Sequence, residues 1–245
     1  MMKLINANCI LELPKIKTNS IDTVICDIPF GTSTCKWDVI IPFDFMWKQL
    51  NRITKSNSPI ILFGIQPFTS KLIISNLQMF KYELIYKKRP VHHLLCNKRQ
   101  MQGHENILVF YKKFRLYNPQ MILRTDNELK RMGQMKCMNG TKIKTERKLN
   151  IIKTKRQSYK FKYPNSILDF KNDQLRNIKH STQKNLLTMI NLVKTYSNEN
   201  DTILDFTAGS FTTGVACKMT NRNFIGIEIN KKKFTEGVLR INKIK

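Results

Sequence analysis

The sequence predicts an α/β protein with a doubly wound, mostly parallel sheet and a basic insertion. Short apolar runs of the kind that form buried strands alternate with segments of helical periodicity along most of the chain. Acidic residues stand at or directly after the end of three of these runs, at Asp27, Asp205 and Glu228. Residues 112–162 differ from the rest, since their periodicity is weak and charge runs throughout them. These observations predict one core interrupted by one insertion.

The first part of the core alternates strands and helices. Its helix over residues 45–53 is predicted from Met46, Leu50 and Ile53, which share one helical face. The expected strands cover residues 3–5, 21–26, 59–64, 82–86 and 107–111, and the expected helices cover residues 45–53 and 67–77.

The second part of the core follows the insertion. Its helix over residues 186–196 is amphipathic, with Leu186, Ile190 and Val193 on one side. The expected strands cover residues 163–170, 202–205 and 224–229, and the expected helices cover residues 186–196, 212–219 and 231–241.

The net charge of +26 indicates a polyanionic partner. Lysines scattered over the surface would explain part of this charge without any partner. Residues 112–162, however, contain 16 Lys or Arg against 3 Asp or Glu, a net +13 that is half of the total. Because the positive charge is concentrated in one segment, nucleic acid is the favoured partner.

The cysteines and the apolar runs indicate the compartment. Six cysteines occur without any Cys-x-x-Cys spacing, which predicts neither a zinc site nor a disulfide framework and is typical of a reducing environment. No apolar run approaches the length of a membrane span, and the N-terminus lacks the architecture of a signal peptide. We therefore expect a cytoplasmic protein without a membrane partner.

Two polar loops each have two interpretations. His92, His93 and His104 occur in one loop, where histidines near nucleic acid are favoured over a metal site because no further ligand stands at a supporting spacing. Trp37, next to Lys36, either packs over the edge of the sheet or contacts nucleic acid.

Asp27-Ile28-Pro29-Phe30-Gly31 leaves the carboxyl end of the strand over residues 21–26. In open α/β sheets, ligands bind at this end of the strands. A carboxylate, a stiff proline turn and an aromatic ring together indicate a ligand site there. Taken alone, the stretch favours an ordinary turn from strand to loop, and the rest of the chain carries the argument for a ligand site.

A second group of residues has the arrangement of a nucleotide-type site. Asp205 ends a buried strand, Gly209 allows close backbone approach, and Glu228 lies 23 residues beyond Asp205, where an acidic residue binds ribose hydroxyls. The expected helix at Thr212 and Thr213 offers unpaired N–H groups. The phosphate-binding patterns Gly-x-x-x-x-Gly-Lys and Gly-x-Gly-x-x-Gly are both missing. S-adenosylmethionine, with an adenosine and an amino-acid end, fits this site better than ATP or a dinucleotide.

Three motifs in order give the chain a resemblance to the amino-group DNA methyltransferases, which make N6-methyladenine or N4-methylcytosine. The catalytic Asp-Pro-Pro-Tyr of this family resembles Asp27-Ile28-Pro29-Phe30, and its Asp-Pro-Phe-x-Gly-Ser-Gly-Thr-Thr resembles the stretch from Asp205 to Thr213. Its His-Pro-Thr-Gln-Lys-Pro is similar to the stretch from His180 to Asn185. The order of the motifs is that of the β group. The resemblance covers nearly the whole chain.

The resemblance implies a Rossmann-like fold with a catalytic half at 1–111, a target-recognition insertion at 112–162 and a cofactor half at 163–245. Asp27, the carbonyl of Ile28 or Pro29, and the stacking ring of Phe30 are the implied catalytic groups. The implied S-adenosylmethionine site comprises Asp205, Phe206, Thr207, Gly209, Ser210, Phe211, Thr212, Thr213, Glu228, Thr182, Gln183 and Lys184. The expected nucleic-acid contacts are Lys36, Trp37, Lys142, Lys144, Arg147, Lys148, Lys153, Lys155 and Arg156.

The implied substrate is double-stranded DNA, with adenine favoured because Asp at the first catalytic position leans towards N6-adenine and Ser towards N4-cytosine. Methylation of RNA adenine, methylation of cytosine N4 and a binding protein without turnover remain the alternatives. The recognition sequence and a restriction partner stay open, and a homodimer is one assembly that the analogy allows.

The chain departs from the family pattern at several positions. Ile28 replaces a proline whose backbone carbonyl is the functional group, and Phe30 replaces a tyrosine without loss of the aromatic face. Ser181 and Asn185 replace prolines, which is expected to loosen the start of the following helix. Phe211 replaces a glycine and is the departure expected to hinder close approach of the methionine end of the cofactor.

Overall fold

The computed structural model describes residues 1–32, 35, 38–88, 96–114, 116–131, 160–170 and 183–244. The chain forms two compact units. The larger one combines Met1–Asn118 with Ser166–Lys245, and the smaller one comprises Pro119–Asn165.

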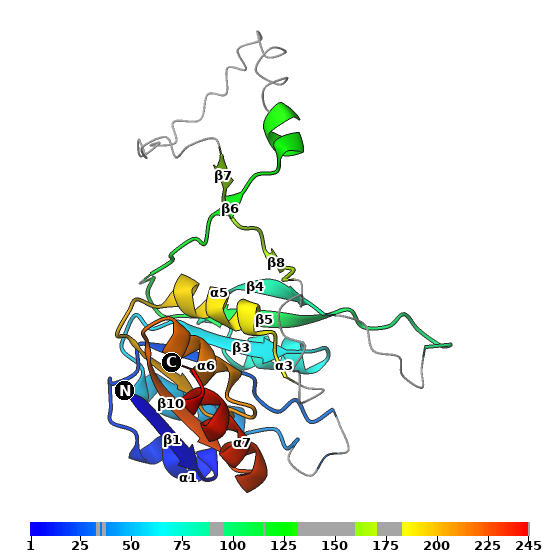
Figure 1. The fold of residues 1–245 in the computed structure, drawn as a ribbon. Coiled ribbons are helices and arrows are strands. Elements are labelled where there is room, and N and C mark those ends of the chain that lie inside the picture. The colour runs from blue at the N-terminus through cyan, green and yellow to red at the C-terminus, as the bar shows by residue number, and fades with distance from the viewer. Residues whose placement is uncertain are drawn as a thin grey trace. The chain divides into compact units, whose positions relative to one another are not determined.

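The larger unit contains an eight-stranded sheet and its covering helices (Figure 1). Its strands are β1 (Met2–Asn6), β2 (Thr23–Cys26), β3 (Ile60–Gly64), β4 (Phe80–Lys87), β5 (His104–Phe110), β8 (Ile167–Leu168), β9 (Thr202–Asp205) and β10 (Asn223–Glu228). Its helices are α1 (Cys9–Glu12), the 3-10 helix η1 (Leu13–Lys15), α2 (Phe43–Ile53), α3 (Phe68–Ser75), α5 (Leu186–Tyr196), α6 (Thr212–Met219) and α7 (Lys231–Asn242).

The strand order is β1-β10-β9-β2-β3-β5-β4-β8. Strands β1, β10, β9, β2 and β3 run parallel, whereas β5 runs antiparallel to both β3 and β4. The predicted doubly wound, mostly parallel sheet is therefore confirmed. Because β2 and β9 are parallel neighbours, their carboxyl ends lie at the same edge of the sheet.

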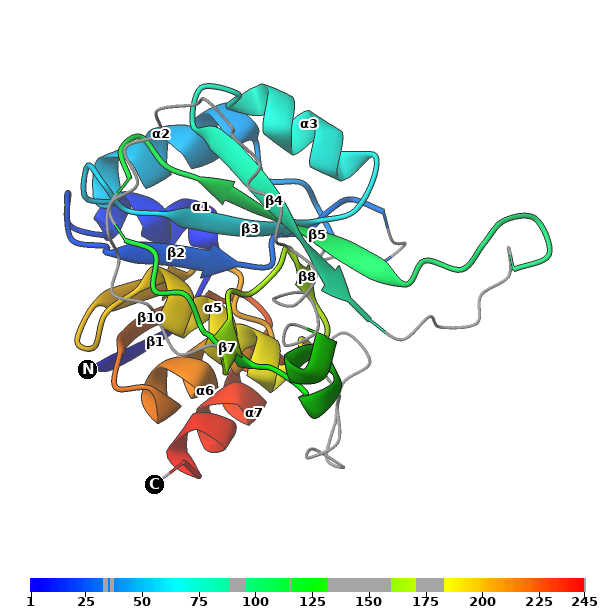
Figure 2. The same ribbon diagram turned by 90° about the horizontal axis from the view of Figure 1, so that it is seen from above.

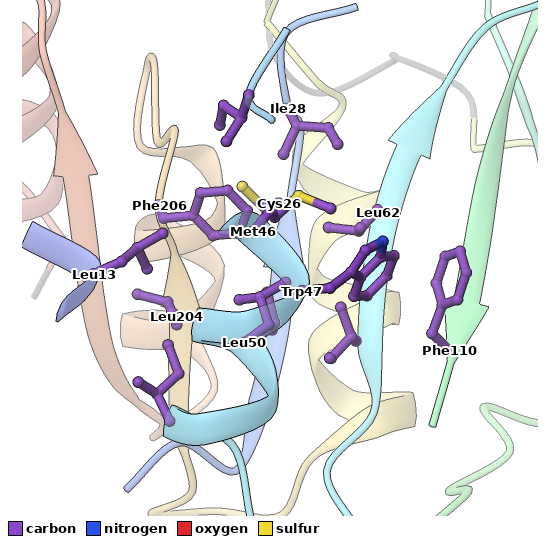
Figure 3. Close-up of a cluster of buried hydrophobic side chains, with 14 of the residues drawn as sticks. Leu13, Cys26, Ile28, Met46, Trp47, Leu50, Leu62, Phe110, Leu204 and Phe206 are labelled. Carbon is purple, nitrogen blue, oxygen red and sulfur yellow. The ribbon is translucent and has the colours of Figure 1, made fainter. Parts of the chain in front are cut away.

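Helices cover both faces of this sheet (Figure 2). Along β3, Ile60 and Leu62 pack against one buried cluster together with α2 and α3, while Ile61 and Phe63 pack against a second cluster with α5 and α6. The first cluster is shown in Figure 3. Burial on both faces explains why the central strands are continuous apolar runs instead of alternating sequences.

Helices α5 and α7 each begin with an asparagine whose side chain serves as the N-cap. The side chain of Asn185 accepts the backbone N–H groups of Leu187 and Thr188 at the start of α5. The expectation that Asn185 loosens this helix is therefore wrong, because an asparagine at this position supplies the acceptor that a proline lacks. Asn230 caps α7 in the same way by accepting the N–H of Lys233.

The smaller unit includes most of the predicted insertion. Its described residues contain the antiparallel pair β6 (Ile122–Leu123) and β7 (Phe161–Lys162), and Lys162 forms an ion pair with Glu128. The strand expected over residues 163–170 is reduced to β8, because only Ile167 and Leu168 pair with β4. None of the helices in the described ranges has the length and apolar character needed to cross a membrane.

Candidate active site

The loop after β2 places Asp27 at the edge of the sheet where β9 also ends. The side chain of Ile28 is buried in the cluster of Figure 3, and the ring of Phe30 lies 5.3 Å from that of Phe68. These two anchors on either side of Pro29 fix the course of the backbone. The sequence-predicted catalytic residues therefore form one ordered turn.

Asp38 closes this turn, although the sequence offered no functional reason to select it. Its carboxylate accepts the backbone N–H groups of Phe30, Gly31 and Thr32 at 2.8, 2.8 and 2.9 Å. Gly31 has a φ of +66°, and a Cβ there would lie 2.8 Å from Cγ1 of Ile40. Three N–H groups converging on one carboxylate hold the Phe30 backbone in place.

The two halves of the expected site meet through Thr207. Its hydroxyl donates to the backbone carbonyl of Asp27 at 3.0 Å and also lies 3.0 Å from Sγ of Cys26. Since Thr207 follows Asp205 at the end of β9, this contact joins the loop of one strand to the loop of its neighbour. Asp27 and Asp205, which are 178 positions apart in sequence, are thereby brought together.

Asp205 is a buried carboxylate held by its own loop. It accepts the hydroxyl of Thr213 at 2.6 Å and the backbone N–H of Thr207 at 3.3 Å. Burial raises the pKa of Asp205 to about 6, and the hydrogen bond from Thr213 offsets only part of this effect. Its main contribution in this structure is to order the turn that precedes α6.

Glu228 ends β10 and accepts two backbone N–H groups, from Gly209 at 2.8 Å and from Asn230 at 2.7 Å. A carboxylate has about four acceptor positions, so hydrogen-bonding capacity remains for hydroxyl groups. Gly209 has a φ of +51°, which a glycine adopts without strain. This part of the loop keeps the features expected of a ribose site.

Phe211 does not obstruct the loop. Its side chain is fully buried and packs edge-on against Phe224 and Phe234, with ring centroids 6.3 and 5.8 Å away. A Cβ at Gly226 would lie 2.7 Å from the ring, and one at Gly237 would overlap it, so these glycines provide the space that the ring fills. The ring therefore belongs to the core, which argues against the expected hindrance of the cofactor.

Lys184 connects the segment before α5 to the catalytic loop. Its Nζ lies 2.6 Å from Oδ2 of Asp27 and 2.9 Å from Oε2 of Glu105, and it is 4.9 Å from the ring centroid of Phe63. Glu105 in turn pairs with Lys88 at 2.5 Å. The expected cofactor residue Lys184 thus contacts the carboxylate of Asp27 directly. Glu105 was not anticipated, because the expected strand over residues 107–111 left it in the preceding loop, whereas β5 begins at His104 and buries it.

The ionisation of these groups is set by burial and by one another. Burial raises the pKa of Asp27, with Glu105 acting in the same direction and Lys184 against it. Burial alone would lower the pKa of Lys184, but the carboxylates of Asp27 and Glu105 outweigh it and raise that pKa. Burial likewise opposes ionisation of Glu105, yet Lys184 and Lys88 bring its pKa below the usual value. The raised pKa of Lys184 favours its charged form.

Several predicted positions lie outside the described residues. They are Lys36, Trp37, His92, His93, Lys142, Lys144, Arg147, Lys148, Lys153, Lys155, Arg156 and Thr182. Gln183 is half-buried next to Lys184, and Phe206 is buried in the cluster of Figure 3. Within the part of the chain that the structure describes, no group of three His, Cys, Asp or Glu side chains has the geometry of a metal site.

A sequence model for a family described as DNA methylase matches residues 21–238, a span that contains the Asp27, Asp205 and Glu228 loops. The chain belongs to this DNA methylase family. The DNA adenine methyltransferase YhdJ of Escherichia coli strain K12 is 26% identical to it over 261 residues, covering 98% of this chain and 82% of the relative.

Solved structures of DNA methyltransferases share the fold of this family member. The structure titled M1.HpyAVI–SAM complex has a TM-score of 0.62 at 23% identity, and the match covers 98% of this chain and 100% of the other. The cytosine-N4-specific PvuII DNA methyltransferase has a TM-score of 0.67 at 14% identity, with coverage of 100% and 88%. These matches confirm the predicted fold class, and the sequence model over residues 21–238 confirms the predicted family.

Proposed function

We propose that this DNA methylase transfers a methyl group from S-adenosylmethionine to the exocyclic amine of a flipped base in DNA, at N6 of adenine. One observation carries the proposal: Oδ1 of Asp27 is buried and has no hydrogen-bond partner among the described residues, whereas Oδ2 is held by Lys184. An unpartnered buried acceptor costs about 1–3 kcal/mol. An N–H of the target amine would satisfy it.

The amine must be activated because its lone pair is delocalised into the base. Oδ1 of Asp27 and the backbone carbonyl of Ile28 or Pro29 accept its two N–H groups, which biases the nitrogen towards tetrahedral geometry. The carbonyl of Asp27 itself is already engaged by Thr207. Asp27 therefore contributes its side chain to the base and its backbone to the alignment of the two loops.

Phe30 supplies the stacking surface for the extruded base. Its ring is half-buried, with Phe68 against it and its backbone N–H held by Asp38. Stacking of a base on an aromatic side chain contributes roughly 1–3 kcal/mol, which offsets the cost of unstacking the base from the duplex. The tyrosine hydroxyl of the family pattern is not required for this contact.

The residues around Glu228 fit the cofactor. Glu228 keeps acceptor capacity for ribose hydroxyls, Gly209 allows close backbone approach, and the ring of Phe211 is buried away in the core. When bound, S-adenosylmethionine supplies an electrophilic methyl group on a sulfonium. Thr207 links the loop that holds the cofactor to the loop that holds the base, so orientation of the two reactants supplies much of the rate.

Adenine is supported over cytosine by Asp27 as the first residue of the catalytic turn and by the similarity to an adenine methyltransferase. The test incubates the purified protein with unmethylated DNA, with RNA and with S-adenosylmethionine, followed by separation of the modified nucleosides. N6-methyladenine in DNA is the expected product. N4-methylcytosine would overturn the choice of base, and label in RNA alone would overturn the choice of substrate.

The role of Asp27 is tested with Asp27→Ala and a control, Asp169→Asn. Asp169 forms an exposed ion pair with Lys87, so its variant removes a carboxylate of the same kind outside the catalytic turn. Loss of a preorganised polar partner in a transition state costs about 10²–10³ in kcat. Asp27→Ala is expected to lose at least that much while Asp169→Asn retains activity. Undiminished methylation by Asp27→Ala would place catalysis elsewhere.

We also assign target recognition to the basic insertion at 112–162, with net charge +13 as the support. Lysine and arginine contacts to phosphate orient a protein on DNA, and base contacts then specify the sequence. The logarithm of DNA affinity is expected to fall linearly with the logarithm of salt concentration, with a slope of about −0.9 for each phosphate contacted. A flat salt response would contradict this assignment.

A further inference from the structure

Four charged side chains form an alternating row that ends at the catalytic carboxylate. The row runs Asp27, Lys184, Glu105, Lys88, with successive N–O distances of 2.6, 2.9 and 2.5 Å. Its members come from the loop after β2, the segment before α5, strand β5 and the residue after β4. Four separate segments of the chain thus contribute to one row of charges.

The two inner members of the row are the most buried. Side-chain exposure is 11% for Lys184 and 8% for Glu105, against 34% for Asp27 and 38% for Lys88. Removal of one partner from a buried ion pair leaves an uncompensated charge, which is strongly unfavourable. Glu105 therefore helps to hold Lys184 in place through a second ion pair beside that with Asp27.

This arrangement has two consequences for Asp27. Lys184 occupies Oδ2 and leaves Oδ1, which is buried and has no partner among the described residues, as the free acceptor. In addition, Glu105 shares the ammonium, so the three groups Asp27, Lys184 and Glu105 carry one net negative charge. With Glu105 neutral, the charge of Lys184 would be directed at Asp27 alone.

We propose that Glu105 is a positioning residue for methyl transfer: by holding Lys184 on Oδ2 of Asp27, it leaves Oδ1 to accept the target amine and keeps a net negative charge beside the nitrogen that becomes cationic. This inference rests on the proposed function of Asp27. Glu105 acts through Lys184 and does not itself contact the base. Lys88, the more exposed partner of Glu105, offsets part of the negative charge of Glu105.

The other groups near Asp27 act less directly. Tyr86 accepts the backbone N–H of Asn185 at 3.2 Å, and its pKa is raised by burial, so it stays a neutral hydroxyl. Burial raises the pKa of Asp205 to about 6, and the negative charge of Asp27 acts in the same direction. Neither contacts Lys184 in the described structure, so Glu105 and Lys88 are the positions at which the row can be changed without altering the catalytic turn.

The test compares Glu105→Gln with Lys88→Gln in the full-length protein. Glu105 raises the pKa of Asp27 and Lys88 lowers it, so the two charge-removing substitutions have opposite predicted effects on that pKa. The pKa of Asp27 is followed by the ¹³C shift of its carboxyl, with the signal identified by its loss in Asp27→Asn. Glu105→Gln is expected to lower this pKa and Lys88→Gln to raise it. Circular dichroism checks that both variants fold.

Turnover provides the second readout. Glu105→Gln is expected to reduce kcat about tenfold or more, with KM for DNA and for S-adenosylmethionine nearly unchanged, because the interaction is realised only in the transition state. The acidic limb of its pH–rate profile moves to lower pH, and that of Lys88→Gln moves to higher pH. A purely structural Glu105 would change stability without displacing these limbs in opposite directions.

The titration of Asp27 and the turnover measurements distinguish a failure of the role of Glu105 from a failure of the proposed function. An unshifted Asp27 pKa in Glu105→Gln, or wild-type kcat in that variant, would overturn the positioning role of Glu105. If the wild-type protein methylates neither DNA nor RNA, the proposed function fails. The carboxyl titration still decides whether Glu105 controls Asp27, because that measurement does not require turnover.

Discussion

Replacement of Phe211 by glycine would restore the family pattern in the cofactor loop, yet we expect it to destabilise the protein. The ring of Phe211 is fully buried between Phe224 and Phe234. Truncation of a buried phenylalanine to alanine costs about 3–5 kcal/mol. Phe211 also has a φ of 56° and a ψ of 32°, a left-handed conformation that costs a residue with a Cβ roughly 1–2 kcal/mol.

These two terms act in opposite directions, and the matched variant Phe211→Ala separates them. Phe211→Ala loses the ring and keeps the backbone strain, so its free energy of unfolding should fall by about 3–5 kcal/mol. Phe211→Gly loses the ring but relieves the strain, so its loss should be smaller by about 1–2 kcal/mol. Gly226 and Gly237, which border the ring, have no side chains. Neither variant therefore fills the space that the ring occupies in the wild type.

Urea unfolding followed by circular dichroism measures these differences, and calorimetric titration measures binding of S-adenosylmethionine. We expect cofactor affinity in Phe211→Gly to match the wild-type value under conditions where both are folded, because the ring is in the core. A Phe211→Gly protein as stable as wild type would refute the assignment of the ring to the core. One less stable than Phe211→Ala would refute the relief of backbone strain at this position. A large gain in cofactor affinity would refute the conclusion that Phe211 leaves the loop open.

Three further predictions concern the same edge of the sheet. The pKa of Asp205 is raised from 3.8 to about 6, so the folded state binds a proton below about pH 6 that the unfolded chain binds only near pH 3.8. As pH falls through this window, the free energy of unfolding of wild type should rise relative to that of Asp205→Asn by up to roughly 3 kcal/mol. In denaturant titrations, a difference in stability between the two proteins that does not depend on pH would contradict the raised pKa of Asp205. Gly31→Ala should lower the free energy of unfolding by about 1–2 kcal/mol, because the φ of +66° persists and Ile40 must move. Urea unfolding measures this loss, and kcat should fall with it. An unchanged stability would mean that the turn relaxes freely. Asp38→Ala removes the acceptor of three backbone N–H groups and should lower kcat while leaving the affinity for S-adenosylmethionine unchanged. Kinetics measures the first quantity and calorimetry the second. Equal losses in kcat and in affinity would argue for general unfolding instead.

The sequence predicted the core well because the information is local there. The apolar run before Asp27, the turn after Asp205 and the acid at Glu228 each identify a strand and its end from neighbouring residues. Parallel strands have their carboxyl ends at one edge, so three local patterns were sufficient to predict one site. Asn185 shows the limit of this reasoning, since its departure from a proline pattern indicated a looser helix and the structure shows a side-chain cap.

What the sequence by itself determined is most of the strands and helices of the core and the family, because short-range apolar patterns and motif order specify these. Only the tertiary structure decided the environment of those groups. It paired Lys184 with Asp27 and Glu105, closed the catalytic turn on Asp38 and placed the ring of Phe211 between two glycines. The Lys184 and Phe211 contacts join separate segments of the chain, and their geometry depends on the packing and burial of the whole sheet, which no local pattern encodes. The Asp38 contacts lie within one loop, whose conformation no apolar periodicity specifies.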